Sequence, residues 1–452
     1  MVFVTKSGAS SHFDGSPQRN SYREVRGHMD DRKTKRKTLD MKRSRISNVE
    51  ISLLCLLFLV TAIALKTSRE TGDREKRVNV AAESSPSPRN STSLECPDQV
   101  RPRQPIQTIT GNSGILRPET SKSAPNYLPN ELILKLGPGA TNIDELAFSL
   151  RAQVTGRIDT LDAYRLQFAD AADASAAREQ LAAHTEVDSV DSNYAISLPP
   201  AGEMVTSTSE SSARLPIRPG DSGGKLVVGL IDTAVQIQSS GLDESFFLPS
   251  ISLAGESRVN PDSLRHGTSM AETILQGLSA VEAGQGDTSV RILSVDVYGD
   301  SDATTSFQVA EGIVKAIEKG ATIINLSLGT DGDSSLLRQV IEDAHAQGII
   351  FFAAAGNEPV TAATYPAAYS EVVAVTATDN QGNIAPYANY GNFVDVGAPG
   401  TVVVSYSGNS YLVTGTSAST AMVCGAAAGL AEQTRSSASK IEEAVRKGLS
   451  LH

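Results

Sequence analysis

KLVVGLI, residues 225–231, is a continuous apolar run that lacks the alternation of a half-exposed strand. Such a run is typical of a strand buried on both faces of a parallel sheet. Further runs follow at 290–297 (VRILSVDV), 321–328 (ATIINLSL), 348–355 (GIIFFAAA) and 371–378 (EVVAVTAT), and helical periodicity at 304–320 and 334–348 separates the early ones. This alternation predicts an α/β domain at 225–452, with a mostly parallel, doubly wound sheet and helices on both faces.

A smaller unit is predicted upstream, at residues 128–198. Strand patterns lie at 131–136, 154–158, 163–168 and 187–196, and helical patterns at 142–153 (Ile143, Leu146, Phe148 and Leu150) and 173–184. The order β-α-β-β-α-β predicts a small α+β sandwich, which by itself is most simply a structural module. A polar, turn-rich stretch at 199–224 links it to the α/β domain.

The first 124 residues divide by charge and hydropathy. Residues 1–50 hold twelve Lys or Arg against six Asp or Glu, a net of +6, which leaves −17 for the rest of a chain whose total is −11. Ile51–Leu65 is uncharged, but as a helix it would span about 22 Å, less than the roughly 30 Å of a membrane core. It therefore suits an export signal as well as a membrane anchor with a basic cytoplasmic leader. A buried core helix is the alternative, and the position of the run between polar tracts argues against it.

An initiation at Met29 or Met41 would shorten the leader to the length of an ordinary signal peptide. Residues 67–124 lack hydrophobic periodicity and are rich in Ser, Thr, Pro and Arg, which predicts a disordered tether. The acidic bulk of the chain argues against nucleic acid as a partner. The three cysteines and six histidines are scattered, so neither a disulfide framework nor a zinc site is expected.

Four polar residues stand where strands end or helices begin: Asp232, His266, Asn357 and Ser417. Each has a simple structural explanation: a cap for Asp232 and Ser417, a turn for Asn357, and a surface role for His266. Together they suggest chemistry, because a serine hydroxyl needs a histidine base and an acid that orients the imidazole. An asparagine amide or a helix-start N–H could then stabilise an oxyanion.

The segments around these residues resemble the signature motifs of the subtilisin-like serine proteases, the subtilases. They read GLIDTAV, RHGTSMAETI, AAAGNE and TGTSAST, with separations of 34, 91 and 60 residues between the four polar side chains. Secondary landmarks agree: NLSLG (325–329), TYPAAY (364–369), YANYG (387–391) and VGAPG (396–400). The upstream unit resembles the subtilase propeptide, which assists folding and then inhibits.

The resemblance implies a role for each matching residue. Ser417 would be the nucleophile, His266 the general base and acid, Asp232 the orienting acid, and Asn357 the oxyanion donor beside the Ser417 N–H. The edges that bind an extended substrate would be Ser327, Leu328, Gly329, Ala354, Ala355 and Gly356. Several positions depart from the residues usual in the family, although none of them removes a catalytic group. They are Ala234, Ser269, Glu272 and Thr420-Ala421-Met422. No cofactor is required, and structural calcium lacks an acidic cluster to support it.

The sequence thus predicts an exported serine endopeptidase, made as a zymogen that cleaves itself within 199–224. Its partners would be protein or peptide substrates, its own propeptide and, through residues 51–65, a membrane. An α/β-hydrolase esterase is excluded, because that family needs a G-x-S-x-G serine first in chain order, whereas GTSAS comes last here. The remaining alternative is a catalytically inactive binding or scaffold protein that keeps the fold.

Overall fold

The computed structural model describes residues 126–139, 142–206, 215–220, 226–255, 262–282 and 286–451, all within the compact unit Ile46–His452. The predicted leader (1–50), apolar segment (51–65) and tether (67–124) lie outside the described residues, as do 207–214 and 221–224 of the second linker and the first residue of the predicted α/β domain, Lys225. Within the described ranges, no helix is long and apolar enough to cross a membrane. The interpretations of the first 124 residues therefore stay predictions.

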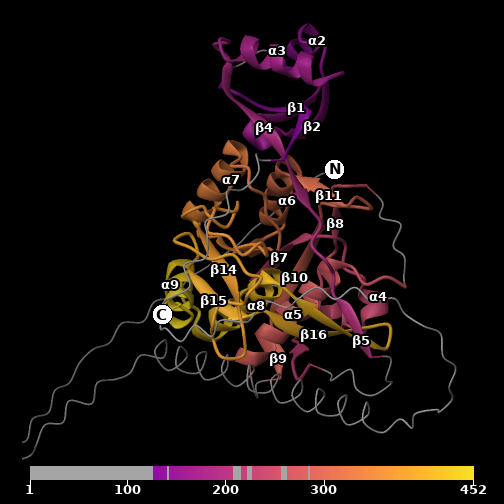
Figure 1. The fold of residues 1–452 in the computed structure, drawn as a ribbon, viewed down its shortest axis with the longest axis vertical. Coiled ribbons are helices and arrows are strands. Elements are labelled where there is room, and N and C mark those ends of the chain that lie inside the picture. Colours follow the sequence, from indigo (N-terminus) through magenta and orange to yellow (C-terminus); the bar gives the residue numbers. More distant parts are fainter. Residues whose placement is uncertain are drawn as a thin grey trace, which may run out of the picture. The chain divides into compact units, whose positions relative to one another are not determined.

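A seven-stranded parallel sheet forms the centre of the downstream part of the chain (Figure 1). Its strand order is β15-β14-β13-β12-β7-β10-β8, and each neighbouring pair is parallel. The strands are β7 (Leu226–Asp232), β8 (Ile251–Ser252), β10 (Val290–Asp296), β12 (Ala321–Leu326), β13 (Ile350–Ala354), β14 (Val372–Thr378) and β15 (Val396–Pro399). The predicted doubly wound α/β class is confirmed.

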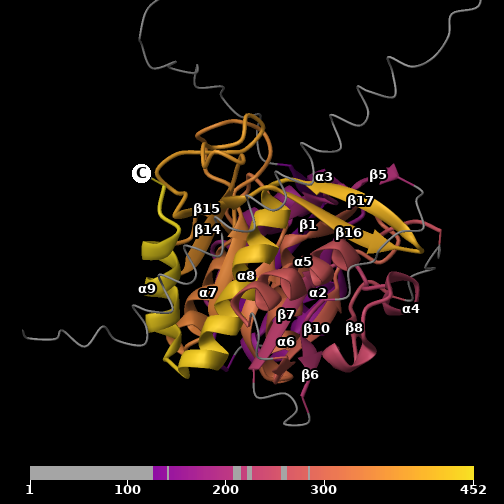
Figure 2. The same ribbon diagram turned by 90° about the horizontal axis from the view of Figure 1, so that it is seen from below.

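Helices cover both faces of this sheet. On one face α5 (His266–Val281) and α8 (Thr416–Thr434) lie side by side, with α9 (Ala438–Gly448) beside α8 (Figure 2). On the other face α6 (Ser306–Glu318) and α7 (Ser335–Ala346) pack together. Strand β7 is buried between them: Val228 and Leu230 join the core under α5 and α8, whereas Val227 and Ile231 join the core under α6 and α7.

Glycines let α5 and α8 pack at backbone contact. A Cβ on Gly425 would lie 1.9 Å from the carbonyl oxygen of Ile274, and one on Gly277 would lie 2.2 Å from that of Met422. No real side chain tolerates such distances, so each helix needs its glycine at the crossing. The close packing fixes the start of α5, where His266 lies, relative to the start of α8, where Ser417 lies.

The upstream unit has the predicted β-α-β-β-α-β order. It comprises β1 (Tyr127–Leu136), α2 (Ile143–Ser149), β2 (Gln153–Ile158), the 3₁₀ turn η1 (Asp159–Leu161), β3 (Ala163–Gln167), α3 (Ala171–Leu181) and β4 (Val187–Ser197). One detail of the prediction is wrong: α2 ends at Ser149, and Phe148 is 86% exposed. Ile143 and Ala147, four positions apart, face the sheet, and the next residue turns away from it by about 100°.

The two units share a sheet. Strand β4 pairs antiparallel with β11 (Ala303–Thr305), which extends the upstream sheet to β11-β4-β1-β3-β2 (Figure 1). After β4 the chain continues to β5 (Glu203–Thr206), which adds to the hairpin of β16 (Thr401–Tyr406) and β17 (Asn409–Thr414). Short elements complete the fold: α4 (Ile237–Ser240), η2 (Glu244–Phe246), and the parallel pair β6 (Arg218–Pro219) and β9 (Asp287–Thr288).

Candidate active site

Asp232 and His266 form a buried pair at the carboxyl edge of the sheet. The imidazole Nδ1 lies 2.9 Å from Asp232 Oδ1 and 2.8 Å from Oδ2, and the two residues are 1% and 2% exposed. With Nδ1 held by a carboxylate, the proton belongs on Nδ1, and Nε2 is left as the acceptor. Nε2 is buried and has no hydrogen-bond partner among the described residues. The pair has the geometry of an oriented base.

Backbone contacts join the loop after β7 to the start of α5. Thr233 Oγ1 accepts the Gly267 N–H at 2.8 Å, and the Asp232 carboxylate accepts the Thr233 N–H at 2.7 Å. A Cβ on Gly267 would lie 2.1 Å from the carbonyl oxygen of Thr233, so only glycine permits this approach. Gln236 adds a second connection, because its Oε1 accepts the Arg265 N–H at 2.9 Å. The sequence therefore holds the acid and the imidazole as one rigid unit.

Ser417 is the second residue of α8 and is 6% exposed. Its hydroxyl donates to the carbonyl oxygen of Ser327 at 3.2 Å, while the Ser327 hydroxyl donates to the carbonyl oxygen of Ser417 at 3.0 Å. The serine hydroxyl thus points to Ser327, and no hydrogen bond joins it to His266. A Ser417–His266 hydrogen bond would require the hydroxyl to leave the Ser327 carbonyl, and rotation about the Cα–Cβ bond is the motion by which a serine hydroxyl changes partner.

Asn357 lies beside the start of α8. Its Oδ1 accepts the Thr416 N–H at 2.9 Å and the Thr416 hydroxyl at 3.1 Å. Because a backbone N–H can only donate, the amide oxygen must face Thr416, and the Nδ2 donors point elsewhere. Asn357 is exposed, so its Nδ2 can reach a ligand. The helix start and the asparagine together provide donors near Ser417, as an anion-stabilising site requires.

The two predicted substrate edges lie next to each other. A Cβ on Gly329 would lie 3.9 Å from the carbonyl oxygen of Ala354, and Gly356 donates its N–H to Thr416 Oγ1 at 3.1 Å. Ser327 and Leu328 are buried, as are Ala354 and Ala355. The structure therefore gathers the predicted edge residues around the start of α8. Their role in substrate binding stays a prediction.

A segment of the upstream chain contacts elements next to this region. We call residues 198–202 (LPPAG) the strap. Its first residue, Leu198, donates its N–H to the carbonyl oxygen of Asp302 at 2.8 Å, and the carbonyl oxygen of Ala201 accepts from Ser269 Oγ at 2.6 Å. A Cβ on Gly202 would lie 2.9 Å from the Val413 side chain. The strap thus runs from β11, past α5 one turn beyond His266, to the strand that leads into Ser417.

Glu272, one of the departures from the family pattern, is buried on α5. Its carboxylate accepts the Ser405 N–H of β16 at 2.9 Å and lies 3.4 Å from Gln276 Nε2. Burial raises the pKa of Glu272 to about 7. Helix α5 nevertheless runs without interruption, and the His266–Asp232 contact is intact, so the departure does not displace the histidine.

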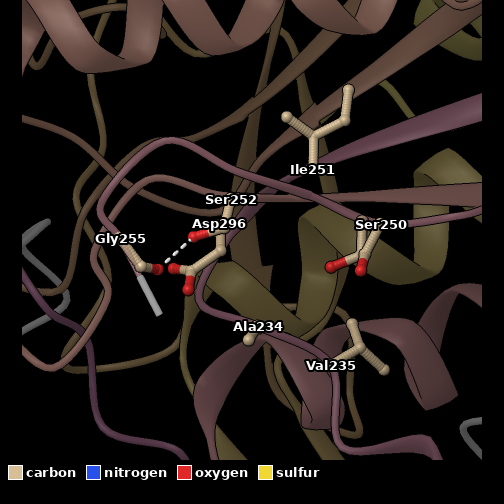
Figure 3. A pocket seen from close by; sticks show the side chains of 8 residues that line it. Ala234, Val235, Ser250, Ile251, Ser252, Gly255 and Asp296 are labelled. Atoms are coloured by element: carbon tan, nitrogen blue, oxygen red, sulfur yellow. Dashed lines mark hydrogen bonds between the residues drawn. The ribbon is translucent and has the colours of Figure 1, made fainter. Parts of the chain in front are cut away.

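A cavity of about 380 Å³ is lined by residues of the loop after β7, of β8 and of the end of β10 (Figure 3). Asp232, His266 and Ser417 are not among its lining residues. The lining residues are Ala234, Val235, Ser250, Ile251, Ser252, Gly255, Ser294 and Asp296. Asp296 Oδ1 accepts the N–H groups of Tyr298 and Gly299, which is a turn-fixing role. Across the described ranges, no group of three or more His, Cys, Asp or Glu side chains could hold a metal ion.

Sequence reasoning did not find three contributors to the site. Asn389 lies in the YANYG landmark, and it binds the Gly356 carbonyl and the Glu358 N–H on either side of Asn357. The sequence does not indicate these contacts, because they form only when the two loops meet in the fold. Ser269 was noted only as a departure, yet its hydroxyl contacts the strap. Thr416 was noted only as part of a motif, yet it binds both Gly356 and Asn357. Each acts through a partner at least 31 positions away along the chain, which a linear pattern cannot reveal.

Two family descriptions match the chain. The subtilase family matches residues 223–447, and the fervidolysin N-terminal prodomain matches residues 115–193. Thermitase of Thermoactinomyces vulgaris is 43% identical over 156 residues, which cover 34% of this chain and 56% of thermitase. Subtilisin DY of Bacillus licheniformis is 34% identical over 215 residues, which cover 46% of this chain and 77% of subtilisin DY. The chain thus spans little more than half of thermitase.

Solved structures show the same fold. Fervidolysin from Fervidobacterium pennivorans, whose structure is described as that of a keratinolytic enzyme related to subtilisin, superposes with a TM-score of 0.52 at 18% identity, covering 70% of this chain and 56% of fervidolysin. The epidermin leader peptide processing serine protease from Staphylococcus aureus gives a TM-score of 0.53 at 16% identity, with 70% and 91% covered.

The fold and the site together define a class: a doubly wound α/β protein with an aspartate, a histidine and a serine, in that chain order, at the carboxyl edge of its sheet. The chain belongs to the subtilase family, as its motifs predict. The predicted likeness of the upstream unit to a propeptide is also confirmed, and we call this unit the prodomain below.

Proposed function

We propose that this subtilase is a serine endopeptidase in which Ser417 attacks the peptide carbonyl. The observation that carries the proposal is the contact of His266 Nδ1 with both oxygens of the buried Asp232 carboxylate, which leaves Nε2 free to accept a proton. His266 takes the Ser417 proton and later gives it to the leaving amine, while Asp232 stabilises the imidazolium. Water then hydrolyses the acyl-enzyme, with His266 again acting as the base, and Ser417 is regenerated.

The oxyanion of the tetrahedral intermediate would be held by Asn357 Nδ2 and the Ser417 N–H. Thr416 supports this assignment, since its N–H and hydroxyl both engage Asn357 Oδ1 and turn the amide nitrogen outward. Loss of one such donor costs about 10²–10³-fold in kcat, a figure measured for subtilisin itself. The adjacent edges 327–329 and 354–356 would bind an extended peptide by strand addition.

A fluorophosphonate probe tests the proposed nucleophile. We expect the purified wild-type protein, incubated until labelling reaches a plateau, to gain one probe per chain on Ser417, because an oriented histidine makes that hydroxyl nucleophilic. Mass spectrometry of the labelled peptide measures the site and the stoichiometry. Ser417→Ala is the control. Labelling of other serines only, or of both proteins equally, would support the inactive scaffold instead.

We further propose that the protein is made as a zymogen and exported. The prodomain is docked through helix starts: Asn193 Oδ1 accepts the Phe307 N–H of α6 at 3.1 Å, and Asp191 Oδ2 accepts the Ser335 N–H of α7 at 2.6 Å. The Tyr194 ring packs on Gly332, where a Cβ would lie 2.0 Å from it. Export and membrane attachment rest on residues 51–65 alone, so N-terminal mass spectrometry of the secreted and membrane fractions is their test.

The strap bears on where the zymogen is processed. Leu198 is bound to β11 and Ala201 to α5, so the two residues in between are Pro199 and Pro200. Both ends of this short stretch are therefore held by the catalytic part of the chain. The burial of His266 Nε2 agrees with a covered site. The proposal is that the strap occupies the cleft in the direction of a substrate, with the Pro–Pro bond near Ser417.

A Pro–Pro bond is a poor substrate for this chemistry. Pro199 has no N–H to donate to a substrate edge, and both rings fix φ near −65°, away from strand geometry. The ring of Pro200 also crowds the leaving nitrogen, where His266 must deliver its proton. The strap would therefore stay intact, and the processing cut in the predicted linker 199–224 would fall downstream of Pro200.

Replacing both prolines by alanine should make the strap cleavable. We expect the Pro199→Ala/Pro200→Ala protein to cut itself between residues 199 and 200, whereas the wild-type protein does not cut this bond. Mass spectrometry of the new N-termini measures the outcome, and the same double variant with Ser417→Ala is the control. Wild-type fragments that begin at Pro200 would refute a resistant strap. An uncut double variant that still labels with the probe would place the strap outside the cleft.

A further inference from the structure

Asn389 is a buried asparagine that contacts the backbone on both sides of Asn357. It lies between β14 and β15 and is 1% exposed. Its N–H donates to the carbonyl oxygen of Gly356 at 2.9 Å, and its Oδ1 accepts the Glu358 N–H at 2.8 Å. One residue thus holds the peptide groups immediately before and after the residue that would donate to the oxyanion.

Asn389 is itself firmly placed. Its Nδ2 donates to Thr364 Oγ1 at 3.2 Å, and its carbonyl oxygen accepts from Thr376 Oγ1 of β14 at 2.6 Å. Gly356 has φ +109°, and a Cβ there would lie 2.5 Å from Asn389 Nδ2, so the loop accommodates the asparagine only because residue 356 is glycine. The contacts connect the Asn357 loop to the central sheet through β14.

The loop needs such a support. Asn357 and Glu358 are exposed, so packing contributes little to their position. A donor in an oxyanion site acts only when held within about 0.5 Å and 10–20° of the productive geometry, and a shift of about 1 Å can cost 10²-fold in rate. Thr416 holds the side chain of Asn357 from the α8 side. Thr416 Oγ1 also accepts the Gly356 N–H, whereas the Gly356 carbonyl and the Glu358 N–H, which flank Asn357, are bound by Asn389.

We propose that Asn389 is a positioning residue for the oxyanion site, acting through the Gly356 carbonyl and the Glu358 N–H on the placement of Asn357. The inference rests on the proposed peptidase function. It assigns to Asn389 an effect on the transition state rather than on substrate binding, because the oxyanion forms only after attack.

The test is a double-mutant cycle between Asn389 and Asn357. Rates of cleavage of a chromogenic peptide amide are measured on the full chain, per Ser417 titrated with the fluorophosphonate probe. Asn389→Ala should lower kcat by 10- to 100-fold with KM changed less than about threefold. In the Asn357→Ala background the same substitution should cost less than about threefold, because the donor that it positions is already absent.

Controls separate positioning from general support of the fold. Thr364→Val, which removes the acceptor of Asn389 Nδ2 but neither contact to the Asn357 loop, should keep kcat within about threefold of wild type. Asn389→Ser is a smaller truncation, for use if the alanine variant does not fold. As with Asn389→Ala, we expect it to lower kcat less in the Asn357→Ala background than in the wild-type background.

Two results would overturn the proposal. One is an unchanged kcat per titrated serine in both Asn389 variants; the other is an equal loss with and without Asn357. If no variant and no wild-type protein labels with the probe, the proposed function fails instead, and the two failures are thereby distinguished.

Discussion

Replacing Asp232 by asparagine is expected to lower kcat by about 10⁴-fold, the loss known for triads whose acid is changed to an amide. Both Asp232 oxygens lie within 2.9 Å of His266 Nδ1. An asparagine would place its NH₂ donors against that nitrogen and drive the imidazole proton to Nε2, where it blocks the base. KM should change little, since Asp232 is 1% exposed and cannot contact substrate. Steady-state kinetics measures the effect, normalised to the concentration of folded protein, because the substitution would also slow labelling of Ser417 by the probe.

Asp296 offers a matched control. It stands opposite Asp232 in the β7–β10 register, is 2% exposed, and binds the N–H groups of Tyr298 and Gly299 rather than a histidine. Asp296→Asn should therefore leave kcat within about tenfold of wild type even if it lowers the unfolding midpoint. Equal losses in the two variants would mean that the carboxylates serve the fold only, and the triad assignment would be abandoned.

The central sheet could be predicted from the sequence because strands that are buried on both faces consist almost entirely of apolar residues. Strand β7 shows this well: Val227, Val228, Leu230 and Ile231 serve two different cores, so no position is free to be polar until the strand ends at Asp232. The prediction of where chemistry would lie followed from topology, since parallel strands bring their carboxyl ends to one edge.

Features set by distant partners were not predictable in the same way. Nothing in YANYG shows that Asn389 will meet Gly356, because the contact depends on how the loop after β14 returns to the loop after β13. Phe148 was counted on an apolar face, yet α2 is only two turns long and turns it to solvent. The sequence analysis does not predict the β16–β17 hairpin, because β17 is mostly only partly buried and neither strand has the continuous apolar run of the central strands.

Asp191→Ala is expected to raise the rate of fluorophosphonate labelling of the intact chain by about 10- to 100-fold. Asp191 Oδ2 accepts the Ser335 N–H at 2.6 Å and the hydroxyls of Ser334 and Ser335 at 3.0 Å each, at the start of α7. Charge-assisted bonds of this kind contribute about 1.5–3 kcal/mol together with the helix dipole. Without them the prodomain would leave the cleft more often, and the strap with it.

Labelling rate, rather than final stoichiometry, is the quantity to compare, because every chain with an intact Ser417 reaches the same plateau. Asp144→Ala is the matched control: it removes the same charge from the prodomain, but Asp144 pairs with Arg157, which also belongs to the prodomain. If both variants label at the wild-type rate, docking at α7 does not limit access to Ser417. If both label faster to the same extent, the effect is one of prodomain charge or stability, and the proposed role of the helix-start contact is wrong.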